Sequence, residues 1–326
     1  MRAIIPVAGI GTRLKPHTHT TPKVLLNVGG KPIIGHILDK LLEEGINKST
    51  FVIGYLGDMI KEYVEKEYPQ MKSDFVEQET MEGLGHAIYT AIPTFDDDEI
   101  FIILGDTVFD VDLKTVFKKK HSALGVKKVE DPRRFGVAVM SNGFIEKLVE
   151  KPQTPISNLA LVGLYYIAKS DALIKSLNNL VEKDIRTKGE LQLTDALQMM
   201  IEEGEKITTF PVEGWYDCGK PETLLSTNQF LLDQKSVSQK FDSTVVINRP
   251  VFIADNVEIS NSVIGPYTTI DKGSKIKECV IKNSIIGSNA LVSKCLLDNS
   301  IIGNNSVIRG TFKRLNSGDS SEIDFY

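Results

Sequence analysis

Apolar residues follow two different spacings along the first 235 residues of the chain. Short runs rich in valine and isoleucine, typical of buried β-strands, alternate with longer segments in which apolar residues recur every three or four positions, as on one side of an α-helix. Strands are predicted at 3–7, 48–53, 74–77, 100–104, 123–129 and 136–140, and helices at 33–44, 59–68 and 113–120. This alternation predicts an α/β domain built on a mostly parallel sheet.

The spacing changes after about residue 236. Beyond a polar stretch at 233–243, aliphatic residues recur at close to six-residue intervals, and a pair of aliphatic residues precedes glycine at 263–265, 285–287 and 301–303. A six-residue period predicts a parallel β-helix in which each side of a triangular prism contributes one inward side chain, whereas an ordinary β-meander would alternate with period two. The residues expected to point inward are Val251, Val257, Val263, Ile270, Ile276, Ile285, Leu291, Leu296, Ile301 and Val307.

The two spacings also predict the domain boundaries. We expect a first domain at 1–235, a β-helix at 244–311 and an acidic, serine-rich tail at 312–326. Three six-residue sides give about 18 residues per coil, so the β-helix has room for about three or four coils. So short a solenoid leaves its end faces uncovered, and we expect it to pack on the first domain or to hold subunits of a homo-oligomer together.

Composition and charge exclude several classes of protein. The 326 residues are 41% hydrophobic and 25% charged, with 38 basic against 43 acidic side chains and a net charge of -5. The sequence has no dense basic stretch that could neutralise the phosphates of a nucleic acid. The apolar run at 3–7 is far shorter than the ~20 residues that cross a bilayer, so we expect a cytoplasmic protein that binds neither membrane nor nucleic acid. The cysteines, Cys218, Cys279 and Cys295, are odd in number and lack metal-site spacing, which predicts reduced thiols.

A glycine-rich turn follows the first predicted strand. It reads Gly9-Ile10-Gly11-Thr12-Arg13 and lies at the carboxyl end of that strand, where open α/β sheets bind their ligands. Backbone N–H groups at such glycines approach an anion closely, and a nearby cation neutralises it. Two glycines alone are not specific, because Leu14 replaces the third glycine of the dinucleotide fingerprint and the Gly-Lys-Ser/Thr of a P-loop is absent.

This turn opens the first of five sequence blocks that resemble, in order, the motifs of the sugar-1-phosphate nucleotidyltransferases. The first block runs Gly9-x-Gly11-Thr12-Arg13-Leu14-x-Pro16 and continues with Thr21-Pro22-Lys23 and Gly30-Lys31-Pro32-Ile33. The others are Gly83-Leu84-Gly85-His86-Ala87, Leu104-Gly105-Asp106, Glu150-Lys151-Pro152 and Trp215-Tyr216-Asp217-Cys218-Gly219, with weaker matches at 162–165 and 189–195. The resemblance covers residues 1 to about 235 and implies a Rossmann-like catalytic domain, which some members follow with a short left-handed β-helix of hexapeptide repeats.

The resemblance implies an enzyme that joins a nucleoside triphosphate to a sugar-1-phosphate. An oxygen of the sugar phosphate attacks the α-phosphorus, and the products are an NDP-sugar and pyrophosphate. Charge and in-line geometry are the main obstacles to such a transfer, so cations and positioning can supply the catalysis without a protein nucleophile.

The family's functional residues correspond to positions of this sequence that match its motifs. By resemblance, Arg13 contacts the departing pyrophosphate, Lys23 the triphosphate and Lys151 the phosphate of the sugar substrate. Asp106 and Asp217 match the metal ligands, and two carboxylates with phosphate oxygens and water suit Mg²⁺. Nucleotide-binding positions match Ala8, Gly9, Gly11, Thr12, Gln78 and Gly83, and sugar-phosphate positions match Gly136, Glu150, Lys151 and Gly163.

Each of these residues also has an ordinary structural explanation. Asp106 could cap a turn at the end of a strand, and Lys23 and Lys151 could be solvated surface lysines. The ordered set of motifs favours the functional roles for all three. Cys218 is better explained as a packed small residue than as a nucleophile, because no activating base is indicated.

The block near Gln78 bears on the choice of base. In relatives that use UTP or dTTP a glutamine in this region hydrogen-bonds the pyrimidine beside a Gly-Leu-Gly or Gly-Leu-Ala block, whereas users of GTP or ATP more often have Gly-Thr-Ala. The resemblance therefore favours a pyrimidine, with glucose-1-phosphate as the commonest sugar substrate. Ala8, Ile10 and Thr107 depart from the thymidylyl pattern, so a mannose-1-phosphate guanylyltransferase stays an alternative.

Two other functions are compatible with the same fold. One is a non-catalytic regulatory subunit. All five residues that the resemblance assigns to catalysis are present, so the sequence offers no reason for a loss of activity: they are Arg13, Lys23, Asp106, Lys151 and Asp217. Acyl transfer by the β-helix is the other, and we reject it because the sequence has no histidine after His121 to serve as a base.

Overall fold

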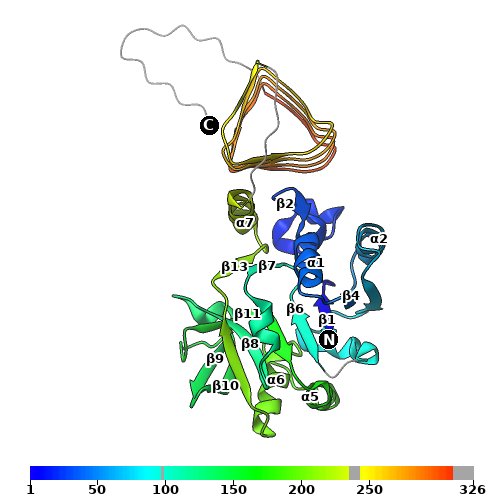
Figure 1. Ribbon diagram of the computed structural model, residues 1–326, viewed down its shortest axis with the longest axis vertical. Helices are drawn as coiled ribbons and strands as arrows, with labels where there is room; N and C mark the ends of the chain where they lie inside the picture. Colours follow the sequence, from blue (N-terminus) through cyan, green and yellow to red (C-terminus); the bar gives the residue numbers. More distant parts are fainter. Residues whose placement is uncertain (97–98, 235–242, 311–326) are drawn as a thin grey trace. The chain divides into compact units, whose positions relative to one another are not determined.

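A computed structural model describes residues 1–96, 99–234 and 243–310 of the chain (Figure 1). Its contacts divide the chain into two compact units, one from Met1 to Thr227 and one from Asn228 onward. The tail expected at 312–326 lies outside the described residues. Within the described ranges, no helix has both the length and the apolar character needed to cross a membrane.

A nine-stranded mixed sheet forms the centre of the first unit, in the order β10-β9-β11-β6-β1-β4-β5, with β8 pairing with both β11 and β12. The strands β1, β4, β5 and β6 run parallel, whereas β11 is antiparallel to β6. All six predicted strands are present. The bounds are β1 (Arg2–Pro6), β4 (Lys48–Ile53), β5 (Lys72–Glu77), β6 (Ile100–Ile103), β8 (Ser122–Lys128), β9 (Gly136–Ser141), β10 (Phe144–Glu150), β11 (Leu159–Ile167) and β12 (Ile207–Pro211).

Helices cover both faces of this sheet because successive side chains of its central strands are apolar. Ala3 and Ile5 of β1 face a core shared with α1, α2 and α4, whereas Ile4 faces a second core shared with α3, α5 and α6. The bounds are α1 (Ile33–Glu43), α2 (Gly57–Glu67), α3 (Leu84–Thr90), α4 (Leu113–Phe117), α5 (Ser170–Glu182) and α6 (Leu193–Glu202). The predicted helix at 113–120 ends at Phe117, because only lysines follow and none can anchor another turn in the core.

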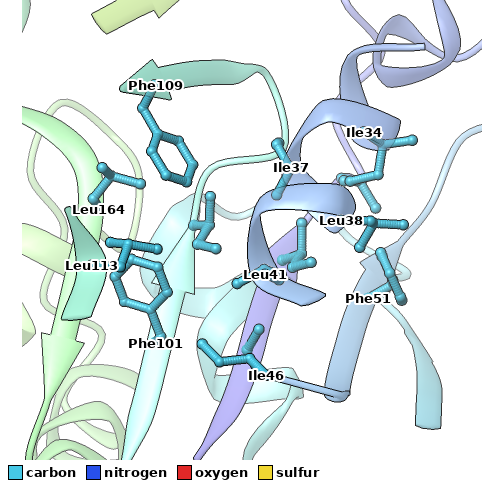
Figure 2. Close-up of a cluster of buried hydrophobic side chains, with 14 of the residues drawn as sticks. Ile34, Ile37, Leu38, Leu41, Ile46, Phe51, Phe101, Phe109, Leu113 and Leu164 are labelled. Carbon is cyan, nitrogen blue, oxygen red and sulfur yellow. The ribbon is translucent and has the colours of Figure 1, made fainter. Parts of the chain in front are cut away.

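Figure 2 shows the first of these cores, where α1 lies on the sheet. Ile34, Leu38 and Leu41 are fully buried and point from the helix toward Phe51 of β4 and Phe101 of β6. This spacing of three and four residues is the one read from the sequence. The contact fixes the position of the loops on either side of α1.

Leu38→Ala is expected to lower the free energy of unfolding by about 2 to 5 kcal/mol, because the buried side chain would leave a cavity that the core fills only in part. Chemical denaturation of both proteins would measure the loss. Met59→Ala on α2 is the control, because Met59 is exposed and its loss should cost about 0.5 kcal/mol or less. Equal losses in the two variants would contradict the assignment of this core.

A two-stranded ribbon beside the sheet brings together segments that are far apart in sequence. Its strands, β7 (Thr107–Asp110) and β13 (Gly214–Asp217), are antiparallel, and Thr107 lies opposite Asp217. A second short ribbon, β2 (Asn27–Val28) with β3 (Lys31–Pro32), follows the glycine-rich turn. The β7–β13 register places Asp217 next to Asp106 in space.

The second unit is a parallel β-helix, seen nearly end-on as a triangle in Figure 1. It has three four-stranded parallel sheets, one on each side of the prism. This architecture confirms the predicted fold class. The strands of the first sheet are β14 (Val245–Ile247), β17 (Ser262–Ile264), β20 (Val280–Lys282) and β23 (Leu296–Asp298); of the second, β15 (Val251–Ile253), β18 (Thr268–Ile270), β21 (Ile285–Ile286) and β24 (Ile301–Ile302); and of the third, β16 (Glu258–Ser260), β19 (Lys275–Lys277), β22 (Leu291–Ser293) and β25 (Val307–Arg309).

The coils are slightly shorter than the predicted 18 residues. Val246 pairs with Val263, Val263 with Val280 and Val280 with Leu296, which gives steps of 17, 17 and 16 residues. Helix α7 (Pro221–Asp233) spans the division between the units, and its Asn228 holds the second sheet through Thr269, whose hydroxyl donates to Asn228 Oδ1 at 2.6 Å. The three cysteines are free and buried, as predicted.

The predicted inward residues of the β-helix are partly wrong by one position. The interior of the prism contains Ile264, Ile286 and Val292, whereas their neighbours Val263, Ile285 and Leu291 lie outside that cluster. The same shift holds in the last coil, where Leu297, Ile302 and Ile308 pack on the interior in place of Leu296, Ile301 and Val307. Adjacent aliphatic residues make two registers possible, and a six-residue period cannot distinguish them.

Candidate active site

The carboxyl ends of β1, β4, β5 and β6 lie along one edge of the sheet. Val7 N–H donates to Val52 O at 2.8 Å, Gln78 N–H donates to Ile53 O at 2.9 Å, and Gly105 N–H donates to Pro6 O at 3.4 Å. The segments that follow these strands carry Gly9, Gln78 and Asp106. Two of the sequence blocks and Gln78, which precedes a third, therefore meet at this edge.

The glycine-rich turn has a fixed backbone. Gly11 has φ of +70°, which favours glycine, and a Cβ there would lie 3.0 Å from Thr18 Cγ2 and 3.1 Å from Lys23 Cβ. The fully buried Thr18 donates its hydroxyl to Gly11 O at 2.9 Å. At Gly9, by contrast, a Cβ would meet no protein atom within 4 Å. The turn therefore exposes its backbone at Gly9, and Thr12 begins the 3₁₀ helix η1 (Thr12–Leu14) that carries Arg13.

Two cations and two carboxylates form a charged cluster, which we define as Arg13, Lys23, Asp106 and Asp217. Lys23 Nζ makes an ion pair with Asp106 Oδ2. A Cβ at Gly219 would lie 2.7 Å from both Arg13 Nη2 and Asp217 Oδ1, so both side chains lie close to this glycine. Cys218 N–H donates to Asp106 O at 2.9 Å, which ties the two aspartate segments together.

The electrostatics of the cluster suit a bound cation. Burial raises the pKa of Asp217 above its ordinary value, and the charge of Asp106 raises it further, whereas Lys23 and Arg13 act in the opposite direction. Two carboxylates that repel each other gain from a shared divalent ion. Among the described residues, no group of three or more His, Cys, Asp or Glu side chains could hold a metal alone. Asp106 and Asp217 therefore fit Mg²⁺, which takes one or two carboxylates and completes its shell with phosphate oxygens and water.

A second group, the Glu150 cluster, consists of Gly136, Glu150, Lys151 and Thr194. Glu150 ends β10 opposite Gly136, the first residue of β9. The Thr194 hydroxyl donates to Glu150 Oε2 at 2.8 Å, and Lys151 Nζ lies 3.4 Å from Glu150 Oε1. A Cβ at Gly136 would lie 2.9 Å from Glu150 Oε2, so a side chain there would displace this carboxylate.

The backbone of Lys151 is unusual for a residue with a side chain. Its φ is +43°, and its N–H donates to Phe135 O at 3.0 Å. Such a backbone is strained for lysine and is most often kept where a side chain must point in a set direction. Phe135 also packs edge-to-face on Trp215, with ring centroids 5.1 Å apart, and this contact links the Glu150 cluster to the strand that carries Asp217.

Gly163, which the resemblance assigns to the sugar-phosphate site, contacts the segment that leads to Asp106. Gly163 has φ of +82°, and Leu104 N–H donates to its carbonyl oxygen at 3.0 Å. A Cβ there would lie 2.6 Å from Leu104 Cδ1. Gly163 therefore allows β11 to approach the Leu104-Gly105-Asp106 block closely.

The third group, the Gln78 cluster, consists of Gln78, Gly83 and His86. Gln78 is only 5% exposed, and its Nε2 donates to Gly83 O at 3.2 Å and lies 3.1 Å from His86 Nδ1. Among the described residues, the side-chain contacts of Gln78 use only the amide nitrogen, so its amide oxygen can accept from another partner. Gly83 has φ of +112°, and a Cβ there would lie 2.6 Å from Leu191 O.

Thr194 and Leu191 are the main residues that the motifs did not single out. Gly85 N–H donates to Leu191 O at 2.8 Å, and Thr194 three residues later holds Glu150. One segment thus supports both the Gln78 cluster and the Glu150 cluster. The only signal in the sequence was the weak match at 189–195.

Cys218 is not a nucleophile. It is fully buried, and burial raises the pKa of its thiol to about 12. Its Sγ lies 3.5 Å from Thr227 Oγ1. These observations support the interpretation of Cys218 as a packed small residue.

Comparisons with known proteins agree with this arrangement. Residues 2–234 match the family described as nucleotidyl transferase. The bifunctional protein GlmU of Methanocaldococcus jannaschii is 39% identical over 261 residues, which are 78% of this chain and 60% of that protein. The chain thus spans about three fifths of the length of that relative.

Two further similarities concern proteins named for glucose substrates. The UTP–glucose-1-phosphate uridylyltransferase AglF of Haloferax volcanii is 32% identical over 243 residues, which are 72% of this chain and 98% of that protein. A crystal structure of a UDP-glucose pyrophosphorylase complexed with UDP-glucose superposes with a TM-score of 0.62 and 25% identity, over 72% of this chain and 99% of that one.

Proposed function

Because the chain belongs to the nucleotidyl transferase family, we propose that it transfers a nucleotidyl group from a nucleoside triphosphate to a sugar-1-phosphate and releases pyrophosphate. The observation that carries this proposal is the charged cluster. Two cations and two carboxylates from three separate sequence blocks lie close together beside the glycine-rich turn. This set of groups can bind phosphates and a divalent ion without any protein nucleophile.

The charged cluster and the Glu150 cluster have different roles in the proposed transfer. Arg13 and Lys23 neutralise the triphosphate, with Arg13 on the β- and γ-phosphates that leave as pyrophosphate. Lys151 binds the phosphate of the sugar substrate and holds its attacking oxygen in line with the α-phosphorus. Glu150, fixed by Thr194 through Oε2, accepts a hydrogen bond from a sugar hydroxyl. Positioning of this kind supplies much of the rate, because the reactants no longer need to meet by diffusion.

We propose Mg²⁺ as the cofactor, held by Asp106 and Asp217. When bound, the ion would withdraw charge from the transferring phosphate and its leaving group. The ion pair of Lys23 with Asp106 keeps the carboxylate oriented toward the triphosphate site. The positive charge of Arg13, which also lies close to Gly219, favours the ionised form of Asp217.

The direct test is a substrate panel. The protein is incubated with Mg²⁺, each of five nucleoside triphosphates and a set of sugar-1-phosphates, and pyrophosphate release is followed. We expect release that needs both substrates, and an NDP-sugar in the same molar amount. Absence of release with every pair, from a folded sample, would favour the non-catalytic regulatory subunit.

Within this panel we propose dTTP or UTP with glucose-1-phosphate as the preferred pair. The relatives named for UTP–glucose-1-phosphate and UDP-glucose support this choice. The amide oxygen of Gln78, left by the contacts of its nitrogen with Gly83 and His86, can accept from N3–H of uracil or thymine. The same acceptor also suits N1–H of guanine, so GTP with mannose-1-phosphate is the second candidate.

Gln78→Ala should reduce the preference among triphosphates, because a buried group that hydrogen-bonds its ligand discriminates by about 1 to 3 kcal/mol per partner. Lys23→Ala should instead lower kcat/KM for all triphosphates in similar proportion. The measurement is kcat/KM for UTP, dTTP, GTP and ATP at one salt concentration. Gln70→Ala, at an exposed position, is the control. An unchanged ranking and ratio in Gln78→Ala would remove the main support for the pyrimidine.

Gly9→Ala tests whether phosphates approach the glycine-rich turn. A Cβ at Gly9 has no protein atom within 4 Å, so the free energy of unfolding should change by about 0.5 kcal/mol or less. If the triphosphate lies against this backbone, the methyl group should raise KM for the triphosphate about tenfold or more. Wild-type KM in this variant would exclude a close approach at Gly9.

We also propose that residues 1–235 hold all of this chemistry in the cytoplasm, whereas the β-helix at 244–311 serves assembly. The residues of all three clusters lie in the first unit, which supports this division.

A further inference from the structure

The first sheet of the β-helix carries a row of aliphatic side chains on its outer face. Val246, Val263, Val280 and Leu296 are in register on four successive coils. Their neighbours Ile264, Ile281 and Leu297 pack on the interior, so this row, which we call the aliphatic ladder, points outward. Leu296 is 80% exposed, Val246 53% and Val280 41%.

The other two faces of the β-helix differ from this one. On the second face, Asn228 of α7 accepts from Thr269 at 2.6 Å and donates to Tyr267 O at 3.2 Å, so the helix covers it. The third face has charged residues in its first coils, where Lys275 Nζ pairs with Glu258 Oε1 at 2.9 Å. Among the described residues, only the first face has outward-pointing aliphatic side chains in register on all four coils.

Charged residues flank the ladder in an alternating pattern. In the third coil, Glu278 lies two residues before Val280 and Lys282 two residues after it. In the fourth coil the signs are reversed, with Lys294 two residues before Leu296 and Asp298 two residues after it. Lys282 and Asp298 are about half exposed and pair at 3.1 Å. These four charged residues thus lie at the corners of a rectangle around Val280 and Leu296, and neighbouring corners carry opposite charges.

We propose that this face is the contact between two copies of the chain, related by a twofold axis parallel to the β-helix axis. Such an axis brings each rung of the ladder opposite the same rung of the second copy and exchanges the two flanking columns. Glu278 then lies opposite Lys282 of the second copy, and Lys294 lies opposite Asp298 of the second copy. All four charges are paired, and the whole ladder is removed from water.

This orientation is favoured over the alternative twofold axis. An axis along the strands reverses the order of the coils, so that full overlap of the ladder would place the third coil against the second. Lys282 would then face Gly265, and Glu278 would face Asn261, leaving the charges without partners. The parallel axis is the one that combines full burial of the ladder with charge complementarity.

The first test is sedimentation velocity of the full chain over a range of concentrations. We expect the wild type to reach the mass of a dimer, and the double variant Val280→Thr with Leu296→Thr to stay a monomer. Threonine is β-branched and therefore suits a strand. The matched control is Leu291→Thr with Val307→Thr, which changes two aliphatic residues of the third face that are 39% and 49% exposed and should leave the dimer intact.

Several outcomes would overturn the proposal. The proposal is wrong if the wild type stays monomeric or forms a trimer. It is also wrong if the ladder variant associates like the wild type, or if the third-face variant loses the dimer.

A charge-reversal experiment tests the orientation without touching the ladder. Lys282→Glu should raise the dimer Kd about tenfold or more, because a carboxylate at this position would repel Glu278 of the second copy. Adding Glu278→Lys should restore the dimer, since the reversed pair is again complementary. Adding Asp298→Lys to Lys282→Glu should not, although it restores a local ion pair of opposite sense. If Asp298→Lys restored the dimer and Glu278→Lys did not, the parallel axis would be wrong.

Discussion

Asp106→Asn is expected to lower kcat by about three orders of magnitude with the fold retained. The substitution keeps the size of the side chain but removes one of the two carboxylates proposed to hold the divalent ion. Such an ion would contribute several kcal/mol to transition-state stabilisation, and each 1.36 kcal/mol corresponds to about a tenfold change in rate. The measurement is pyrophosphate release at saturating concentrations of both substrates and Mg²⁺, with far-UV circular dichroism to verify folding.

Asp110→Asn is the control for this experiment. Asp110 ends the same strand, β7, but is exposed and lies opposite Gly214. Its substitution should leave kcat within about twofold of wild type. Near-normal turnover of Asp106→Asn, or full activity of the wild type in EDTA, would exclude the metal assignment.

Gly219→Ala is expected to reduce kcat/KM about a hundredfold, although the substitution adds only a methyl group. The new Cβ would lie 2.7 Å from Arg13 Nη2 and from Asp217 Oδ1, so one or both must move. Both atoms end flexible side chains, so the backbone can stay in place while the charged cluster is distorted. A displacement of about 1 Å in a catalytic site can cost a factor of about 100 in rate.

Cys218→Ala is the matched control at the neighbouring position. The thiol packs against Thr227 and lies on the buried side of the chain, so its loss should lower stability more than turnover. Thermal melting and steady-state kinetics of both variants separate the two effects. If Gly219→Ala kept wild-type kinetics, the positions of Arg13 and Asp217 beside this glycine would have no role in the reaction.

The sequence motifs predicted which residues meet at the sheet edge better than hydrophobic patterns predicted the details of the fold. Lys23 and Asp106 are 83 residues apart and still form an ion pair, because both follow segments whose positions are fixed by parallel strands. Short motifs carry this information when their chemistry requires particular residues. Thr194 lies in the weak match at 189–195, but its role was not predicted, because it depends on a contact with Glu150, 44 residues away.

Strands β10 and β11 were missed for two different reasons. In β10 the register shifts between Ile145 and Lys147, so the alternation of apolar and polar residues is broken. In β11 nearly every residue is buried, because other elements cover both sides, and a continuous apolar run has no period of two. In the β-helix, paired aliphatic residues such as Val263 and Ile264 satisfied the period equally well in either register.

The ion pair between Lys23 and Asp106 has a consequence for the order in which ligands add. While the ammonium group neutralises Asp106, this carboxylate attracts a free divalent ion only weakly. A triphosphate offers Lys23 a stronger partner and at the same time delivers a bound metal ion. The metal should therefore enter as a complex with the nucleotide and not before it.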